Sequence, residues 1–183
     1  ILTLSGSLKM SAELEIVSCS IFRTELEELK RQGCIDLPID WISSMLHIYP
    51  ELLEKQLGKT LQRQREKGKK SVVVFGDCHP TMHCISDACQ SCRTRGINCC
   101  EIILGHNDYH KFREEGYFFL MPEWTLRWRD IFIKEVGLTE LTIKPFFQDM
   151  HTAMMYLDTG LIPVPYKELE EIKEATGLPV EIR

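Results

Sequence analysis

Cysteine is the residue type most able to do chemistry in this sequence, and most of the cysteines lie in one stretch. Residues 71–105 contain six of the eight cysteines and two of the six histidines. Thiolate sulfur and imidazole nitrogen are ligands that zinc prefers, and clustered thiols also serve redox reactions. Metal binding or redox chemistry is therefore the first class of function to test.

Three of the cysteines end predicted strands that lie far apart in the sequence, namely Cys19, Cys78 and Cys100. In a parallel sheet, ligands bind outside the carboxyl ends of the strands, where successive loops converge. We therefore expect the three thiols to meet at one edge of the fold and to bind zinc, with an open fourth position. The alternative is that each thiol is a small residue that fills a strand-to-helix turn.

Two histidines and a glutamate are candidates for catalysis beside these thiols. His47 begins a helix after the second predicted strand, and His79 follows Cys78 directly. Either histidine could complete the metal site or act as an acid or base, and we favour His47 as the fourth ligand. Glu101, next to Cys100, is the third candidate, although it could simply favour a helix N-terminus.

A competing pattern lies inside the same stretch. Cys84, Cys89 and Cys92 have the C-x4-C-x2-C spacing that can bind an iron–sulfur cluster, with Cys99 or Cys100 as a distant fourth ligand. Such ligands usually lie in a loop, whereas this segment can be helical, and on a helix Cys84 would not align with the other two. The spacing is thus an alternative to the zinc site.

Trp124 stands where a predicted strand meets a helix. Its ring could stack on a planar cofactor, or it could pack in the core with Trp128, four residues later. We include it as a candidate cofactor-binding residue.

Apolar runs alternate with amphipathic segments, which is the pattern of an α/β fold. Strands are expected at 14–19, within 34–44, and at 71–76, 96–99, 117–121 and 178–182. Helices are expected at 22–32, 51–66, 100–112, 124–136, 146–157 and 166–175, and residues 81–95 form a helix or an irregular loop. We predict an open, mostly parallel sheet with helices on both faces, a Rossmann-like three-layer sandwich.

The composition is that of a globular protein. A length of 183 residues suits one domain, which we place at residues 10–183; residues 1–9 precede Met10 and form an extension of unknown role. The net charge of −5 gives no basic surface for nucleic acid or anionic lipid, and no apolar run reaches the roughly 20 residues that span a bilayer. We expect a cytoplasmic protein, in which clustered thiols are metal ligands or catalytic groups more often than disulfides.

The chain also resembles a family known only as domain of unknown function number sixteen thirty-eight. The resemblance rests on short motifs along nearly the whole chain, at residues 16–20 with Arg23 and Glu25, 46–50, 75–78, 98–105, 119–124 and 157–161. Family members often have Cys-Gly after the first strand and Gly-Leu-Cys-Gly after the third; this chain keeps Cys19 and Cys78 with different neighbours. In this family the genes often lie beside genes for corrinoid-dependent methyltransferases of anaerobes. The resemblance therefore implies a role in one-carbon metabolism.

Together these observations predict a zinc-binding enzyme or accessory protein in methyl transfer, with a corrinoid protein or a methyltransferase as its partner. The physical reason is that zinc lowers the pKa of a bound thiol and yields a nucleophile that can accept a methyl group. One alternative is a non-catalytic module that carries a corrinoid, haem or iron–sulfur group. Another is an interaction protein with buried free thiols.

Overall fold

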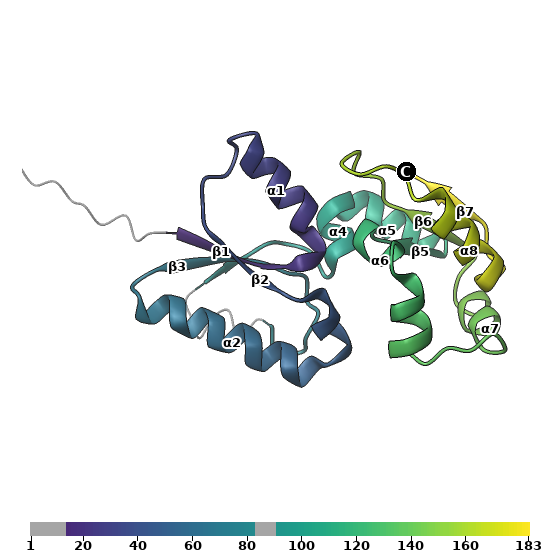
Figure 1. Ribbon diagram of the computed structural model, residues 1–183, viewed down its shortest axis with the longest axis horizontal. Helices are drawn as coiled ribbons and strands as arrows, with labels where there is room; N and C mark the ends of the chain where they lie inside the picture. The colour runs from purple at the N-terminus through teal and green to yellow at the C-terminus, as the bar shows by residue number, and fades with distance from the viewer. Residues whose placement is uncertain (1–13, 83–90) are drawn as a thin grey trace, which may run out of the picture.

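The strands form two separate parallel sheets. The structure, a computed structural model, describes residues 14–82 and 91–183. The first sheet has the strand order β2-β1-β3-β4 and the second the order β5-β6-β7. Figure 1 shows each sheet in its own lobe, the first built from the N-terminal half of the chain and the second from the C-terminal half. The predicted α/β class is confirmed, but the strands are divided between two sheets.

The first lobe is built around β1, which pairs with β2 on one side and β3 on the other. Five of the six residues of β1 are buried, as expected for a central parallel strand with both faces covered. Helices α1 and α2 lie on opposite faces of the sheet (Figure 1). The elements are β1 (Leu14–Cys19), η1 (Ser20–Phe22), α1 (Arg23–Arg31), β2 (Ile39–Ile42), η2 (Ser44–Ile48), α2 (Pro50–Glu66), β3 (Lys70–Val74) and β4 (Cys92–Arg93).

The second lobe is built around β6, whose four residues are all buried between β5 and β7. The helix before its last strand ends at Gly177, which has a φ of 68° that favours glycine. The elements are α4 (Cys99–Leu104), α5 (His106–Glu114), β5 (Tyr117–Leu120), α6 (Pro122–Thr125), η3 (Asp130–Glu135), α7 (Ile143–Gln148), β6 (Ala153–Tyr156), α8 (Tyr166–Thr176) and β7 (Val180–Ile182).

Two predicted elements were wrong in type, and the helices expected at 100–112 and 124–136 are each divided, the first into α4 and α5 and the second into α6 and η3. The helix expected at 146–157 is the end of α7 followed by β6, and the strand expected at 96–99 is the turn that leads into α4. A short apolar run buried on every side shows no alternation, so its sequence does not distinguish a central strand from a buried helix. Because β6 was not predicted as a strand, one sheet was expected instead of two.

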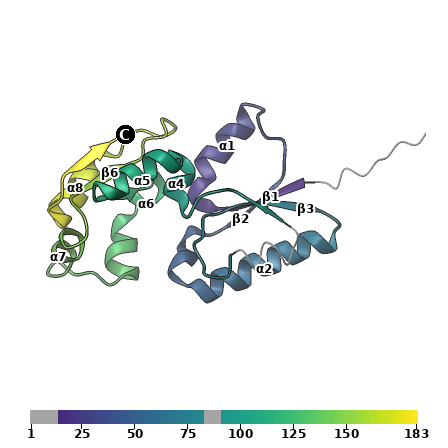
Figure 2. The same ribbon diagram turned by 180° about the vertical axis from the view of Figure 1, so that it is seen from behind.

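The carboxyl ends of the two sheets face each other across the junction between the lobes (Figures 1 and 2). Ser44 follows β2 and donates a hydrogen bond of 2.8 Å to Glu123, which follows β5. Thr159 follows β6 and donates one of 3.3 Å to Glu25 in α1. Second-lobe side chains also belong to the core of the first lobe, namely Tyr109, Phe112, Met121, Met155 and Leu157.

None of the helices in the described part of the chain is both long and apolar enough to cross a bilayer. The extension predicted at residues 1–9 lies outside the described residues, and the boundaries of the single predicted domain stay a prediction.

Candidate functional site

Four free thiols stand at the carboxyl edge of the first sheet. Cys19 is the last residue of β1, Cys78 lies in the turn after β3, and Cys99 and Cys100 begin α4. We call these four residues the thiol group. Every cysteine in the described ranges is a free thiol, which leaves these sulfurs available to bind a metal.

A close backbone contact holds two of these segments together. A Cβ atom at Gly76 would lie 2.3 Å from Cα of Asn98, so only glycine fits at this position. The amide of Asp77 donates to the carbonyl of Ile97 at 2.9 Å, beside this contact. Asn98 then caps α4, because its side chain accepts a hydrogen bond of 2.9 Å from the amide of Glu101. The turn that carries Cys78 is thereby fixed against the start of α4.

The thiols affect one another's ionisation. Burial raises the pKa of Cys19, and the nearby charges of Cys99, Cys78 and Glu123 raise it further. Burial also raises the pKa of Cys78 to about 12, again with a contribution from Cys99. The sulfurs of three separate segments therefore lie within electrostatic range of one another.

Cys99 is the thiol of this group that ionises first. Its sulfur lies 3.9 Å from that of Cys100. Because Cys100 can donate its S–H to a thiolate on Cys99, the pKa of Cys99 is lowered and that of Cys100 is raised. From the sequence, Cys99 is expected only as an alternative distant fourth ligand of an iron–sulfur cluster. The signal that could have found it is Asn98, a helix-capping residue that places the next residue at a helix start.

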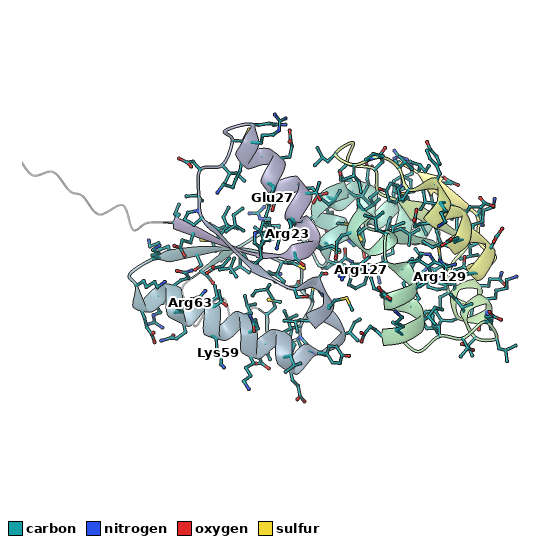
Figure 3. All side chains as sticks on the ribbon, viewed as in Figure 1. Arg23, Glu27, Lys59, Arg63, Arg127 and Arg129 are labelled. Carbon is teal, nitrogen blue, oxygen red and sulfur yellow. The ribbon has the colours of Figure 1, made fainter. Side chains whose placement is uncertain are left out.

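The second lobe contributes a polar network beside the thiols. Glu123 pairs with Arg127 at 2.5 Å, and Arg127 also donates to the hydroxyl of Ser44 at 3.1 Å. Figure 3 shows Arg127 between the two lobes, whereas Lys59 and Arg63 lie on the outer helix α2. The charge of Glu123 raises the pKa of both Cys19 and Cys99, so the carboxylate lies close to the thiol group. Sequence reasoning did not find this network, because it forms only where two lobes meet.

His47 lies at the same junction. Its ring stacks on Phe75 at 6.4 Å and meets Trp124 edge-on at 6.1 Å. Burial lowers its pKa, which favours the neutral imidazole. Its Nδ1 lies 2.8 Å from the carbonyl oxygen of Ser44, and a carbonyl can only accept, so Nδ1 carries the proton and Nε2 keeps its lone pair.

His79 is held on the side of α2. Its Nδ1 accepts a hydrogen bond of 3.1 Å from the amide of Thr81, and its Nε2 lies 3.7 Å from a carboxylate oxygen of Glu54 in α2. The 3.7 Å distance is longer than a hydrogen bond, so Nδ1 is the hydrogen-bonded nitrogen in these contacts. The catalytic role expected for His79 stays a prediction.

Trp124 lines a mostly apolar cavity of about 340 Å³ that reaches two of the thiols. Residues of its wall include Cys99, Cys100, Tyr109, Phe119, Met121 and Trp124. The volume is at the lower end of the roughly 300–1,000 Å³ typical of ligand sites. Trp124 therefore stands where a small ligand would meet the thiol group.

Several buried polar atoms around the junction have no hydrogen-bond partner in the described structure. They are Oε2 of Glu25, Nε1 of Trp124, Nε of Arg127 and the hydroxyl of Tyr156. Such atoms are rare in folded proteins, because each costs the free energy of lost hydration. Water or a polar ligand at the junction would satisfy them.

Glu101 belongs to a different group of side chains. Its carboxylate lies 2.7 Å from Nδ1 of His106 and 3.7 Å from Nε2 of His110. Among residues 14–82 and 91–183, these three form the set of metal-ligating atoms that all lie within 4.8 Å of one another, and the thiol group does not meet that criterion. Glu101 is thus placed in a second cluster, which the sequence argument missed although His106 and His110 have the i,i+4 spacing of a shared helix face.

The structure does not test the iron–sulfur pattern. Cys84 and Cys89 lie outside the described residues, and Cys92 is exposed on β4. The cluster remains a prediction.

Comparison with known proteins places the chain in a family. Residues 41–183 match the family described as Protein of unknown function (DUF1638). No curated protein and no solved structure matches the chain. Because the match covers more than half of the sequence, the chain belongs to the DUF1638 family of proteins of unknown function.

Proposed function

We propose that the thiol group binds a thiophilic metal ion, zinc in the first place, at the junction of the two lobes. The observation that supports this most is that thiols from three separate segments lie within electrostatic range of one another at the carboxyl edge of a parallel sheet. Buried thiols keep their protons until a cation replaces them, and metal binding releases those protons. A buried thiol cluster without disulfides is therefore suited to a metal.

The donor set fits zinc. Thiolate sulfur and neutral imidazole are its common ligands, and the tautomer of His47 leaves Nε2 with a lone pair. Sulfur ligands lie about 2.3 Å from zinc. Since the thiol sulfurs are more widely spaced than a compact ligand set, binding requires the cysteine side chains to rotate toward the ion. Cys19, Cys78 and Cys100 with His47, or with Cys99 in its place, would hold the metal.

Cys99 is the best candidate for a reactive sulfur. It lines the apolar cavity, it is partly exposed, and its lowered pKa favours the thiolate. Bound zinc would keep a coordinated thiol deprotonated at neutral pH. Trp124 and its apolar neighbours would exclude water from a small group that approaches this sulfur.

From the sequence resemblance we further propose methyl transfer, with a methylated corrinoid protein as the donor. In that step a bond forms between the methyl carbon and the thiolate sulfur of Cys99. The cobalt–carbon bond breaks, and both of its electrons stay on cobalt. The apolar wall beside Cys99 supports this proposal by offering space for a methyl group.

Metal analysis of protein purified without chelator tests the zinc proposal. We expect C99S/C100S to hold about one zinc per chain less than the wild type. The control is C34S/C92S, which removes two exposed cysteines outside the thiol group and should retain the metal. Wild-type protein without tightly held metal, or equal zinc in both double variants, would contradict the proposal.

The apolar cavity favours a second candidate, a non-catalytic module that binds a small planar ligand. Arg113 is exposed at the wall of this cavity and forms no ion pair with any described residue, so a ligand with an acidic group would suit it. A visible absorption spectrum separates the candidates, because a corrinoid, haem or iron–sulfur group colours the protein and zinc does not.

A further inference from the structure

A second group of metal ligands lies at the corner between α4 and α5. Glu101 of α4 and His106 and His110 of α5 each present one ligand atom, and the three atoms lie within 4.8 Å of one another. We propose that these residues form a second site for a divalent transition-metal ion such as Zn²⁺, separate from the thiol group. Two imidazoles and a carboxylate are a common ligand set for such ions.

The carboxylate is fixed in place before any ion arrives. One oxygen of Glu101 accepts a hydrogen bond of 2.6 Å from the amide of Ile97, and its own amide is bound by Asn98. The other oxygen faces both histidines. These hydrogen bonds hold the buried ligand of the set in a fixed orientation.

The two imidazoles converge on that free oxygen from one face of α5. His106 and His110 are separated by one helical turn, and their ring centroids lie 4.3 Å apart. Gly105, with a φ of 78°, makes the bend between the two helices that brings His106 back to Glu101. His106 is 73% exposed, so an ion can enter from solvent.

The site is distinct from the thiol group although Glu101 follows Cys100 in sequence. Successive residues on a helix point about 100° apart, because each turn holds 3.6 residues. Its three ligands leave a position for water or for a group from another molecule. A simple Glu–His ion pair would need only one histidine, whereas here a second ring approaches the same oxygen.

Calorimetric titration of the full chain with Zn²⁺ tests the proposal. The C99S/C100S variant serves as the background, because it removes two members of the thiol group and leaves the corner intact. We expect this variant to bind about one Zn²⁺, and addition of H106Q/H110Q to weaken that binding by more than about 100-fold, beyond the effect of losing an outer-shell partner. Asp108→Asn, an exposed change on the same helix, should leave the affinity unchanged.

Unchanged affinity after H106Q/H110Q, or no binding in the C99S/C100S background, would overturn the proposal. Far-UV circular dichroism checks that each variant is folded. Titration with Co²⁺ keeps the two sites distinguishable, because thiolate ligands give sulfur-to-cobalt charge-transfer absorption and nitrogen or oxygen ligands do not. If wild-type protein loaded with Co²⁺ does not show that absorption, the thiol site is contradicted and the corner site is not.

Discussion

The junction of the two lobes and the corner between α4 and α5 offer metals opposite environments, although neighbouring residues of α4 serve both. At the junction the donors are sulfurs, mostly buried, with pKa values raised by burial. At the corner they are a fixed carboxylate and two accessible imidazoles. The junction also holds buried polar atoms without partners, whereas the corner carboxylate has its oxygens satisfied.

The two environments suit different kinds of metal binding. A buried thiol site binds a soft ion tightly and shields a reaction from water, at the cost of deprotonating several thiols. An exposed Glu–His–His site exchanges its ion readily and keeps an open position. The two sites therefore differ in role mainly because one is buried and the other is exposed, although their residues are neighbours in the sequence.

The largest effect is expected from a change at the contact between Gly76 and Asn98. Gly76→Ala places a Cβ 2.3 Å from the backbone of Asn98, so one of the two segments must shift. We expect the free energy of unfolding to fall by about 1–3 kcal/mol and the thiol-bound zinc to be lost. Urea unfolding and metal analysis measure both.

The matched control is Gly58→Ala in α2, where no atom lies within 4 Å of the new Cβ. It should raise the free energy of unfolding by about 0.5–1 kcal/mol. Equal behaviour of the two variants would show that the contact between Gly76 and Asn98 does not organise the site.

Thiol reactivity should separate the members of the thiol group in metal-free protein. The pKa of Cys99 is lowered by the Cys100 S–H, whereas that of Cys78 is about 12, so Cys78 stays protonated through pH 9. We expect iodoacetamide to modify Cys99 at least about 10-fold faster than Cys78 or Cys19 at pH 8, because the thiolate is the nucleophile. Peptide mass spectrometry measures each site, and comparable rates at Cys99 and Cys78 would refute the assignment.

Glu123→Gln tests whether the second lobe tunes these thiols. The negative charge of Glu123 raises the pKa of Cys99, so its removal should lower that pKa and enlarge the thiolate fraction. Alkylation of Cys99 at pH 7.5 should become about 2- to 3-fold faster, a size typical of a partly screened charge. Glu27→Gln, on the exposed surface of α1, is the control and should change nothing. A slower reaction in E123Q would contradict the account.

The smallest effect concerns the unpartnered carboxylate oxygen of Glu25. Burial raises the pKa of Glu25, so the folded state prefers the protonated acid and loses stability as the pH rises through that pKa. Glu25→Gln should therefore raise the free energy of unfolding at pH 7 by about 1 kcal/mol or less. The gain should shrink toward pH 4, where the wild-type residue binds a proton. Urea unfolding at both pH values measures the stability gained by Glu25→Gln. A gain that is larger at pH 4 than at pH 7 would contradict the prediction.

Sequence reasoning succeeded where local pattern and fold class decide the outcome. The apolar run at 14–19 and the amphipathic pattern that became α2 predicted their elements closely. The rule that ligands gather at the carboxyl edge of a parallel sheet led to Cys19 and Cys78 at that edge.

The features of the fold and the site that the sequence did not predict depend on contacts between distant segments. The uniformly buried β6 looks like a helix in sequence, so the second lobe was not expected. Glu123 and Arg127 meet Ser44 only because that lobe docks on the first. The special position of Cys99 follows from a sulfur contact with Cys100, which residue spacing does not report.

X-ray absorption at the zinc edge identifies the atoms that bind zinc at the junction, when it is measured on an H106Q/H110Q variant in which the corner site is disabled. The account predicts a shell dominated by sulfur at about 2.3 Å, with at most one nitrogen ligand. A shell made only of nitrogen and oxygen at about 2.0–2.2 Å, or protein that retains no zinc, would contradict it.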